Sequence, residues 1–327
     1  MDTKEKILDD LVFIIEELLE HLESKNEISL LSEKNVEVIT EKLYNLYSFD
    51  YRFKEIVVDV VDCTIHPTKK ARVKNELAIY KKSLVKAENL CLEAIRRGIL
   101  NKIEKINGWD YIYISDFEKY KKYVGSRIYL NCTAEAIPDL MLQIIRKIKE
   151  QLEINLSCSF CGLQARPYEI ICNNCKKFLP RVYPLSIKFI DPQSLNENQL
   201  AEILRPDKIV LYIYPWPNLV QELTKWFTPL LKRGFYEDVP LFAKKIANGI
   251  GYAPEPTSKQ KNLYESDGGT SKSFGSILSF LIAKVVCRWV DDKREIPKKE
   301  DIMSIAEWTY EKIFKDRYKL EFDLGIK

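Results

Sequence analysis

Four of the eight cysteines form a pattern that is typical of a metal site. Cys158 and Cys161 make one C-x-x-C hook, and Cys172 and Cys175 make a second hook after an interval of ten residues. Thiolate sulfur is a preferred ligand of Zn²⁺, and four such ligands close its tetrahedral coordination sphere. The spacing therefore predicts one structural zinc ion in a small ribbon. A redox dithiol pair and an iron-bound knuckle are the alternatives.

A ribbon of this kind needs tight turns and a source of stability other than a large apolar core. Gly162 and Asn174 are residue types that adopt the left-handed backbone of such turns at low cost. Lys176, Lys177 and Arg181 would partly offset the negative charge of four thiolates around the ion. Zinc binding stabilises comparable modules by about 10–16 kcal/mol, so loss of the metal should unfold the ribbon.

No set of residues suited to catalysis stands out in the sequence. The two histidines are isolated, and we expect His21 on a solvated surface and His66 in a turn before Pro67. The segment from Gly268 to Ser273 lacks the glycine that a Walker loop places directly before its lysine. A zinc ion with four protein ligands has no position for a catalytic water. We therefore expect that the protein is not an enzyme.

Basic residues gather in three segments and suggest contact with nucleic acid. Residues 67–102 carry 10 basic and 3 acidic side chains, whereas residues 1–60 carry 7 basic and 15 acidic ones. A basic helix face binds phosphates through released counterions, but it can equally be a solvated face or pair with the acidic N-terminal helix. Aromatic residues accompany the cations of the ribbon, and a third basic group follows residue 252. The candidate contacts with RNA or duplex DNA are Lys69, Lys70, Arg72, Lys74, Arg166, Lys176, Lys177, Arg181, Lys259, Lys261 and Lys272.

The spacing of apolar residues predicts the elements that position these side chains. Residues 53–63 fit either a helix or a strand, residues 252–275 read as a long loop, and no internal repeat is apparent. Strands are expected over residues 109–115, 127–132, 185–190 and 208–214. Helices are expected over residues 1–23, 33–47, 67–100, 134–153, 197–204, 218–233, 237–250, 274–291 and 298–316.

Together these elements predict an α+β fold that is mainly α-helical. The small zinc ribbon is expected as an insertion between α/β elements, and the C-terminus as a helical bundle. The aromatic residues between Tyr212 and Phe227 are expected to be packing. The predicted parts are a helical N-terminal region (1–104), a small α/β segment (105–156), the zinc ribbon (157–182), a second α/β segment (183–236) and the C-terminal helical bundle (237–327).

Composition and charge are those of an ordinary globular protein. The 327 residues are 46% hydrophobic and 30% charged, with a net charge of +3. The longest apolar stretch, from Ile277 to Val286, is much shorter than the ~20 residues that span a bilayer. The other cysteines, Cys63, Cys91, Cys132 and Cys287, are expected as buried thiols in a reducing compartment. We expect a cytoplasmic protein with no membrane and no small-molecule substrate as partner.

The cysteine module from Cys158 to Cys175, the α/β region before it and a helical C-terminal region resemble the large subunit of type I-A CRISPR interference (Cascade) complexes. A composition rich in Lys, Glu and Ile, as in thermophilic archaea, adds to this resemblance. It implies a non-catalytic subunit for antiviral defence that contacts crRNA and target DNA among the protein subunits of a larger complex. The alternatives are an archaeal or viral zinc-ribbon transcription or replication factor, or a structural adaptor.

Overall fold

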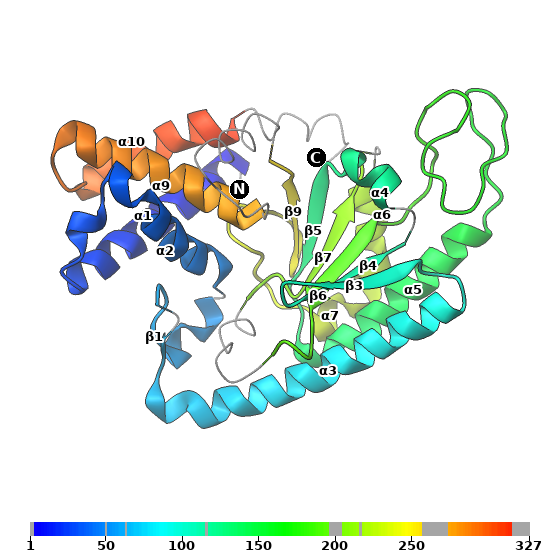
Figure 1. Cartoon of the computed structure of the whole chain (residues 1–327), viewed down its shortest axis with the longest axis horizontal. Coiled ribbons are helices and arrows are strands. Elements are labelled where there is room, and N and C mark those ends of the chain that lie inside the picture. The colour runs from blue at the N-terminus through cyan, green and yellow to red at the C-terminus, as the bar shows by residue number, and fades with distance from the viewer. Residues whose placement is uncertain are drawn as a thin grey trace. The chain divides into compact units, whose positions relative to one another are not determined.

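The protein has a mixed α/β structure, seen in a computed structural model (Figure 1). The structure describes residues 3–49, 51–62, 64–114, 117–195, 205–215, 218–256 and 274–315. These residues form two compact units whose sequence segments interleave. Among the described residues, unit 1 comprises those within 3–71, 240–244 and 254–315, and unit 2 comprises those within 72–239 and 245–253.

Unit 1 is helical, and its core joins the two ends of the sequence. The predicted apolar stripe of α1 (Thr3–Ser24) is buried along its whole length, from Ile7 to Leu22. It packs with α2 (Val36–Ser48) and with α10 (Lys299–Thr309), which continues as the π-helical turn Tyr310–Phe314. Helix α9 (Phe274–Lys293) packs against α2 and α10. The C-terminal helices therefore do not form the separate bundle that we expected, because their apolar faces are covered by α1 and α2.

A close contact between two helices of unit 1 depends on a glycine. Gly275 in α9 faces α2 so closely that a Cβ atom there would overlap the rings of Tyr44 and Tyr47. A short strand pair, β1 (Val57–Asp59) with β2 (Thr64–Ile65), follows a 3-10 helix at Tyr51–Ile56. The ambiguous segment 53–63 thus contains both helix and strand.

Unit 2 is built on a sheet in which the described residues contribute seven strands, in the order β3-β4-β6-β7-β5-β9-β8. The pairs β3–β4, β4–β6, β6–β7 and β7–β5 are antiparallel. The four strands expected from the sequence are β4, β5, β6 and β7. The bounds are β3 (Lys102–Ile106), β4 (Trp109–Tyr113), β5 (Ser126–Leu130), β6 (Ser186–Ile190), β7 (Ile209–Ile213), β8 (Lys244–Ala247) and β9 (Ile250–Pro254).

A ladder of branched side chains forms the centre of this sheet. The register aligns Ile112 with Ile187, Ile187 with Leu211, and Leu211 with Ile128 across four neighbouring strands. All four side chains are fully buried. Because aligned residues share one face of a sheet, this ladder fixes the register of the four strands.

Unit 2 has two long helices, and the second of them, α5, continues into the ribbon (Figure 1). Helix α3 (Lys70–Arg96) ends before Gly98, whose φ of +70° stops it as expected. Helix α5 (Ile137–Glu153) buries one apolar stripe, which runs from Ile137 to Ile148. The chain passes from the end of this helix directly into the ribbon. Shorter helices are α4 (Phe117–Tyr120), α6 (Leu219–Phe227) and α7 (Leu231–Gly234), with a 3-10 turn at Thr228–Leu230 between the last two.

The helix predicted over residues 237–250 is wrong. Residues 244–247 form β8, and Gly249, at φ +64°, turns the chain into β9. A Cβ atom at Gly249 would overlap the carbonyl oxygens of Asn131 and Tyr236, so the turn packs tightly against β5 and its continuation. The predicted helix 197–204 lies outside the described residues, as does most of the predicted loop 252–275. Among the described helices, none is both long and apolar enough to cross a bilayer.

Candidate metal centre

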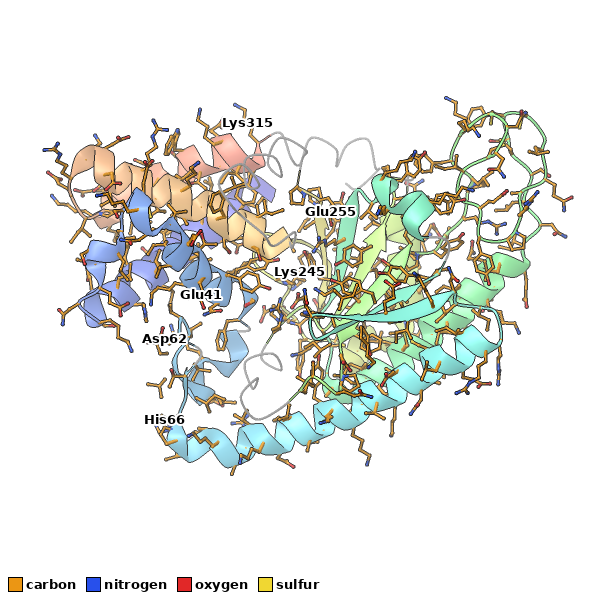
Figure 2. All side chains as sticks on the ribbon, viewed as in Figure 1. Glu41, Asp62, His66, Lys245, Glu255 and Lys315 are labelled. Carbon is orange, nitrogen blue, oxygen red and sulfur yellow. The ribbon has the colours of Figure 1, made fainter. Side chains whose placement is uncertain are left out.

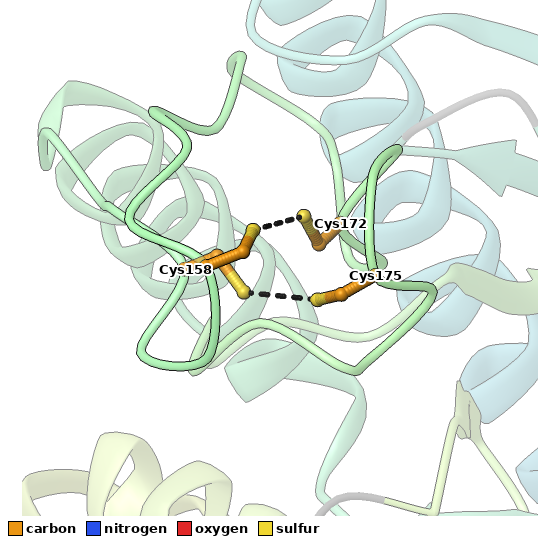
Figure 3. A group of neighbouring side chains, drawn as sticks. Cys158, Cys172 and Cys175 are labelled. Carbon is orange, nitrogen blue, oxygen red and sulfur yellow. Dashed lines mark hydrogen bonds between the residues drawn. The ribbon is translucent and has the colours of Figure 1, made fainter.

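The four cysteines of the two hooks converge on one point (Figure 3). The Sγ atoms of Cys158 and Cys175 are 3.3 Å apart, and those of Cys161 and Cys172 are 3.5 Å apart. All four Sγ atoms lie within 4.8 Å of one another. A tetrahedron with Zn–S distances of ~2.3 Å has sulfur atoms ~3.8 Å apart, so a small shift accommodates the ion. The donor set and the spacing both fit a metal with four thiolate ligands.

The two hooks have the same backbone structure, displaced by fourteen positions. The amide of Cys158 donates to the carbonyl of Leu163, and the amide of Cys172 donates to that of Lys177. Two further bonds repeat in the same way. The amide of Ala165 donates to the carbonyl of Leu156, as that of Leu179 does to Ile170. The β-bridge between Ser157 and Gln164 corresponds to the one between Ile171 and Phe178. The ribbon is therefore an internal structural repeat that is not apparent in the sequence, since only the cysteines are common to both copies.

Each hook ends in a residue with left-handed backbone. Gly162 has φ +72° and Lys176 has φ +59°, and each directly follows the second cysteine of its hook. Their amides donate to the carbonyls of Cys158 and Cys172. Glycine was expected here, but the assignment of Asn174 is wrong because the turn falls on Lys176.

The environment of the thiols favours thiolate formation on one side of the cluster. The amide of Leu163 is the main cause that lowers the pKa of Cys161 to about 6, and that of Phe160 lowers the pKa of Cys158. The amide of Lys177 acts in the same direction on Cys175, but burial and the three neighbouring sulfurs raise its pKa to about 12. Four crowded thiols thus hold protons among themselves, and a divalent cation would replace those protons.

The ribbon has very little core of its own. Cys158, Cys172 and Leu179 are its buried cluster, with Ala165 and Cys175 partly buried beside them. So few apolar side chains cannot offset the conformational entropy of some two dozen ordered residues. A metal ion held by the four cysteines would add stability to this segment.

Arg181 fastens the base of the ribbon to α5. Its side chain is 1% exposed, and its guanidinium donates to the carbonyls of Gln151, Arg166 and Glu169 at 2.7–3.0 Å. The amide of Val182 also donates to Oε1 of Gln151. The prediction that Arg181 contacts a nucleic acid is wrong, because these carbonyls occupy its donors and burial hides it from a phosphate.

Aromatic residues of the ribbon differ in their roles. Phe178 stacks on Tyr214, with ring centroids 5.6 Å apart, and meets the edge of Tyr123. Phe160 does not cover the cluster: its side chain is 67% exposed, and the centroid of its ring lies 5.8 Å from Nζ of Lys177. Tyr212, Tyr214, Trp226 and Phe227 are buried, as expected of packing residues.

The other predicted basic contacts do not form one surface. Arg166, Lys176 and Lys177 are exposed on the ribbon, and Nζ of Lys176 donates to the carbonyl of Asn173. Arg72 and Lys74 are exposed in the first turns of α3. The ribbon meets the opposite end of this helix of 27 residues, which is ~40 Å long at 1.5 Å per residue. Lys69 and Lys70 precede Arg72, and Lys259, Lys261 and Lys272 lie outside the described residues.

Both histidines have hydrogen-bond partners within the fold. His21 is 7% exposed, so its expected place on a solvated surface is wrong. Lys42 donates to its Nε2 at 3.0 Å, so the proton of Nδ1 faces Asp59 at 3.1 Å. His21, Asp59 and Asp62 lie close enough together to hold a metal ion. However, Lys25 lies 3.3 Å from Asp59 and Lys42 lies 3.6 Å from Asp62, so these lysines already supply the positive charge that a metal would bring.

His66, labelled in Figure 2, accepts from the amide of Thr68 at the turn where it was expected. Cys91, Cys132 and Cys287 are buried as predicted. Burial raises the pKa of all three thiols, to about 12 for Cys132 and Cys287. Cys63 lies outside the described residues.

Comparisons with known proteins indicate a different class from the one expected. The sequence model of the HopA1 effector protein family matches residues 201–305, which is less than half of the chain. Among solved structures, the effector protein from Pseudomonas syringae pv. tomato strain DC3000 aligns over 81% of this chain and 83% of its own. With 11% identity and a TM-score of 0.35, this alignment carries no argument about function. No curated protein matches the chain.

The family match overturns the resemblance to a CRISPR interference subunit. The matching family is an effector family, and nothing in the match concerns crRNA, target DNA or antiviral defence. The alternatives of a transcription or replication factor find no support either. The resemblance depended on the cysteine spacing, which many unrelated zinc ribbons share because it reflects the coordination of the metal.

Proposed function

We propose that this chain is an effector-type protein without catalytic activity that acts by binding another protein. In this proposal, one Zn²⁺ keeps the ribbon folded. The observation that carries the proposal is the convergence of Cys158, Cys161, Cys172 and Cys175 at the spacing of a tetrahedral site. The effector type is supported by the family match over residues 201–305.

Zinc fits this donor set better than the alternatives. Four thiolates with two closely spaced hooks are typical of structural zinc, which needs no open coordination position. A redox dithiol would use one hook, whereas here each short sulfur pair joins one cysteine from each hook. Because four ligands close the coordination sphere, the role of the ion is to order the ribbon and not to activate water.

Binding to a protein is supported by the exposed end of the first hook. Phe160 and Leu163 are large apolar residues that are 67% and 48% exposed, and Lys177 lies beside Phe160. Burying them against a partner would be favourable at roughly 25 cal/mol per Å² of apolar surface. A rigid metal-bound loop also loses little entropy on binding.

The zinc site is tested by elemental analysis of the purified full-length protein. We expect one zinc per chain, and a large loss of zinc in Cys172→Ser because serine does not provide a thiolate. Ser157→Ala, beside the first hook, is the matched control and should keep the zinc. Zinc-free wild-type protein, or a Cys172→Ser variant with normal zinc content, would exclude the site.

The binding role is tested by chemical cross-linking in cells that make the protein. A single partner protein should be captured by the wild type and lost from Phe160→Ser/Leu163→Ser with its zinc retained. Ile154→Ser, which changes an exposed apolar residue before the ribbon, should keep the partner. Equal capture by both variants would show that the end of the hook is not the binding surface.

A further inference from the structure

A pocket of about 420 Å³ lies in unit 2 where α3 ends beside α5. Arg97 and Ile99 come from the end of α3, Leu142 to Lys149 from α5, and Leu230 from the turn after α6. This volume falls in the range of about 300–1,000 Å³ that small-ligand sites occupy. The elements around it are two long helices, so its walls are held on rigid supports.

The lining of the pocket has two chemical characters. Ile99, Leu142, Ile145 and Leu230 provide apolar surface, and Leu142 is 52% exposed. The cationic lining residues are Arg97, Arg146 and Lys149, against one acidic residue, Asp139. A ligand that buries the apolar surface and places an anionic group beside the cations would satisfy both.

The existing partners of these cations are weak competitors. Arg97 pairs with Glu93 at 2.8 Å, Arg146 with Glu150 at 3.7 Å, and Lys149 with Glu153 at 3.6 Å. All three basic side chains are more than half exposed, and exposed ion pairs within one helix contribute little. None of the three glutamates lines the pocket. An anion in the pocket can therefore recruit these cations at small cost.

The zinc ribbon contacts both walls of the pocket. The hydroxyl of Tyr168 donates to the carbonyl of Gly98, which lies between Arg97 and Ile99. Tyr168 has φ +67°, an unfavourable conformation for an aromatic residue that the folded ribbon maintains. Arg181 and Val182 bind Gln151, two residues beyond Lys149 on α5. Ordering of the ribbon thus fixes the end of α3 relative to α5.

We infer that this pocket binds an amphiphilic anion, an aromatic or branched apolar group that carries a carboxylate, phosphate or sulfonate, and that the zinc ribbon holds the pocket in its binding shape. The second half of the inference rests on the proposed structural zinc. The same chemistry is offered by a free small molecule or by an acidic peptide segment with one large apolar side chain.

The test uses anilinonaphthalene sulfonate, a fluorescent aromatic anion, titrated into the zinc-loaded full-length protein. We expect saturable binding at one site, and about tenfold weaker binding by Arg146→Gln/Lys149→Gln. Lys82→Gln/Lys86→Gln, on the exposed part of α3 away from the pocket, is the matched control and should bind normally. Phenylnaphthylamine, which lacks the anionic group, should bind much more weakly than the sulfonate.

Competition then distinguishes the sources of the ligand. Displacement of the dye by naphthoate or naphthyl phosphate supports a small molecule and identifies its anionic group. Displacement only by an acidic peptide with a central phenylalanine supports a protein segment. The proposed ligand site would be overturned by absence of saturable dye binding, or by equal binding of the dye to Arg146→Gln/Lys149→Gln and to its control. This holds even if the zinc content is one per chain.

A separate variant tests whether the ribbon holds the pocket in its binding shape. Tyr168→Phe removes the hydroxyl that reaches Gly98 and keeps the ring, so we expect unchanged zinc content and several-fold weaker dye binding. Near-ultraviolet circular dichroism should show that the fold is retained. Normal dye affinity in Tyr168→Phe and in chelator-treated wild type would overturn the link, whereas a zinc-free wild type would instead contradict the proposed metal site.

Discussion

At the scale of single residues, Asp110 is a carboxylate that the fold buries away from water. It is fully buried on β4, and neither of its carboxylate oxygens has a hydrogen bond among the described residues. Lys105 lies 3.3 Å away but also pairs with Glu88 and Asp191. Desolvation is the main cause that raises the pKa of Asp110 to about 6, with the two neighbouring carboxylates adding to it. The charged form of Asp110 is therefore a cost to the fold.

Asp110→Asn should stabilise the protein at neutral pH. A pKa raised from ~3.9 to about 6 means that the folded state binds a proton more tightly, so stability falls as pH rises through 4 to 6. The variant should gain roughly 1–3 kcal/mol at pH 7 to 8, and the gain should vanish near pH 4. Urea unfolding at several pH values measures this difference.

The matched control is Glu104→Gln on the neighbouring strand. The hydrogen bond from Lys102 is the main cause that lowers the pKa of Glu104, so removing its charge should give no gain at neutral pH. A gain of equal size in both variants would show that general charge reduction is responsible. No gain in Asp110→Asn would mean that Lys105 fully compensates the buried charge.

At the scale of elements, the ribbon depends on turns that the cysteines alone do not specify. The first hook has Gly162 at its left-handed position, whereas the second has Lys176. A lysine side chain in this conformation costs about 1 kcal/mol that glycine avoids. The second hook is therefore the more strained of two otherwise equivalent turns.

Lys176→Gly should slow the release of zinc to a chelator and stabilise the ribbon by about 1 kcal/mol. Lys177→Gly is the matched control, because the backbone of Lys177 is not in the left-handed conformation. This variant loses only the lysine side chain and some backbone rigidity. Zinc transfer to a chromophoric chelator, followed by absorbance, reports both rates. The assignment of strain fails if both variants lose zinc at the same rate.

Some elements could be predicted from sequence because their signals are local. The stripe from Ile7 to Leu22, the strands around Ile112 and Leu211, and the two hooks all depend on spacing within one segment. Strand β8 could not be predicted, since its pairing partner β9 is needed to favour a strand over a helix. The anchoring role of Arg181 was equally hidden, because its three carbonyl partners become neighbours only in the folded chain.

At the scale of the whole molecule, the two units have separate cores. Unit 1 joins α1 and α2 to α9 and α10, and the ribbon belongs to unit 2. This arrangement could not be predicted, because an apolar stripe indicates that a helix packs against a partner but does not identify that partner. A consecutive division into domains was the natural expectation for the same reason.

Removal of zinc should therefore have a local effect. With a strong chelator, hydrogen exchange should accelerate in residues 157–181 and at the end of α3, where Tyr168 is bonded to Gly98. Protection of α1, α2, α9 and α10 should not change, since no ribbon residue belongs to their unit. Mass spectrometry of exchanged peptides measures both regions, and loss of protection throughout the chain would contradict independent cores.

The fourteen-residue repeat of the hooks has a consequence for how the ribbon can be rearranged. Residues 156–165 and 170–179 carry the same backbone bonds, so each half presents two sulfurs in the same geometry. Exchanging the sequences of the two halves would preserve the tetrahedron and move Phe160 and Leu163 to the other side of the metal. The ribbon would then display its apolar tip in a new direction, with coordination intact.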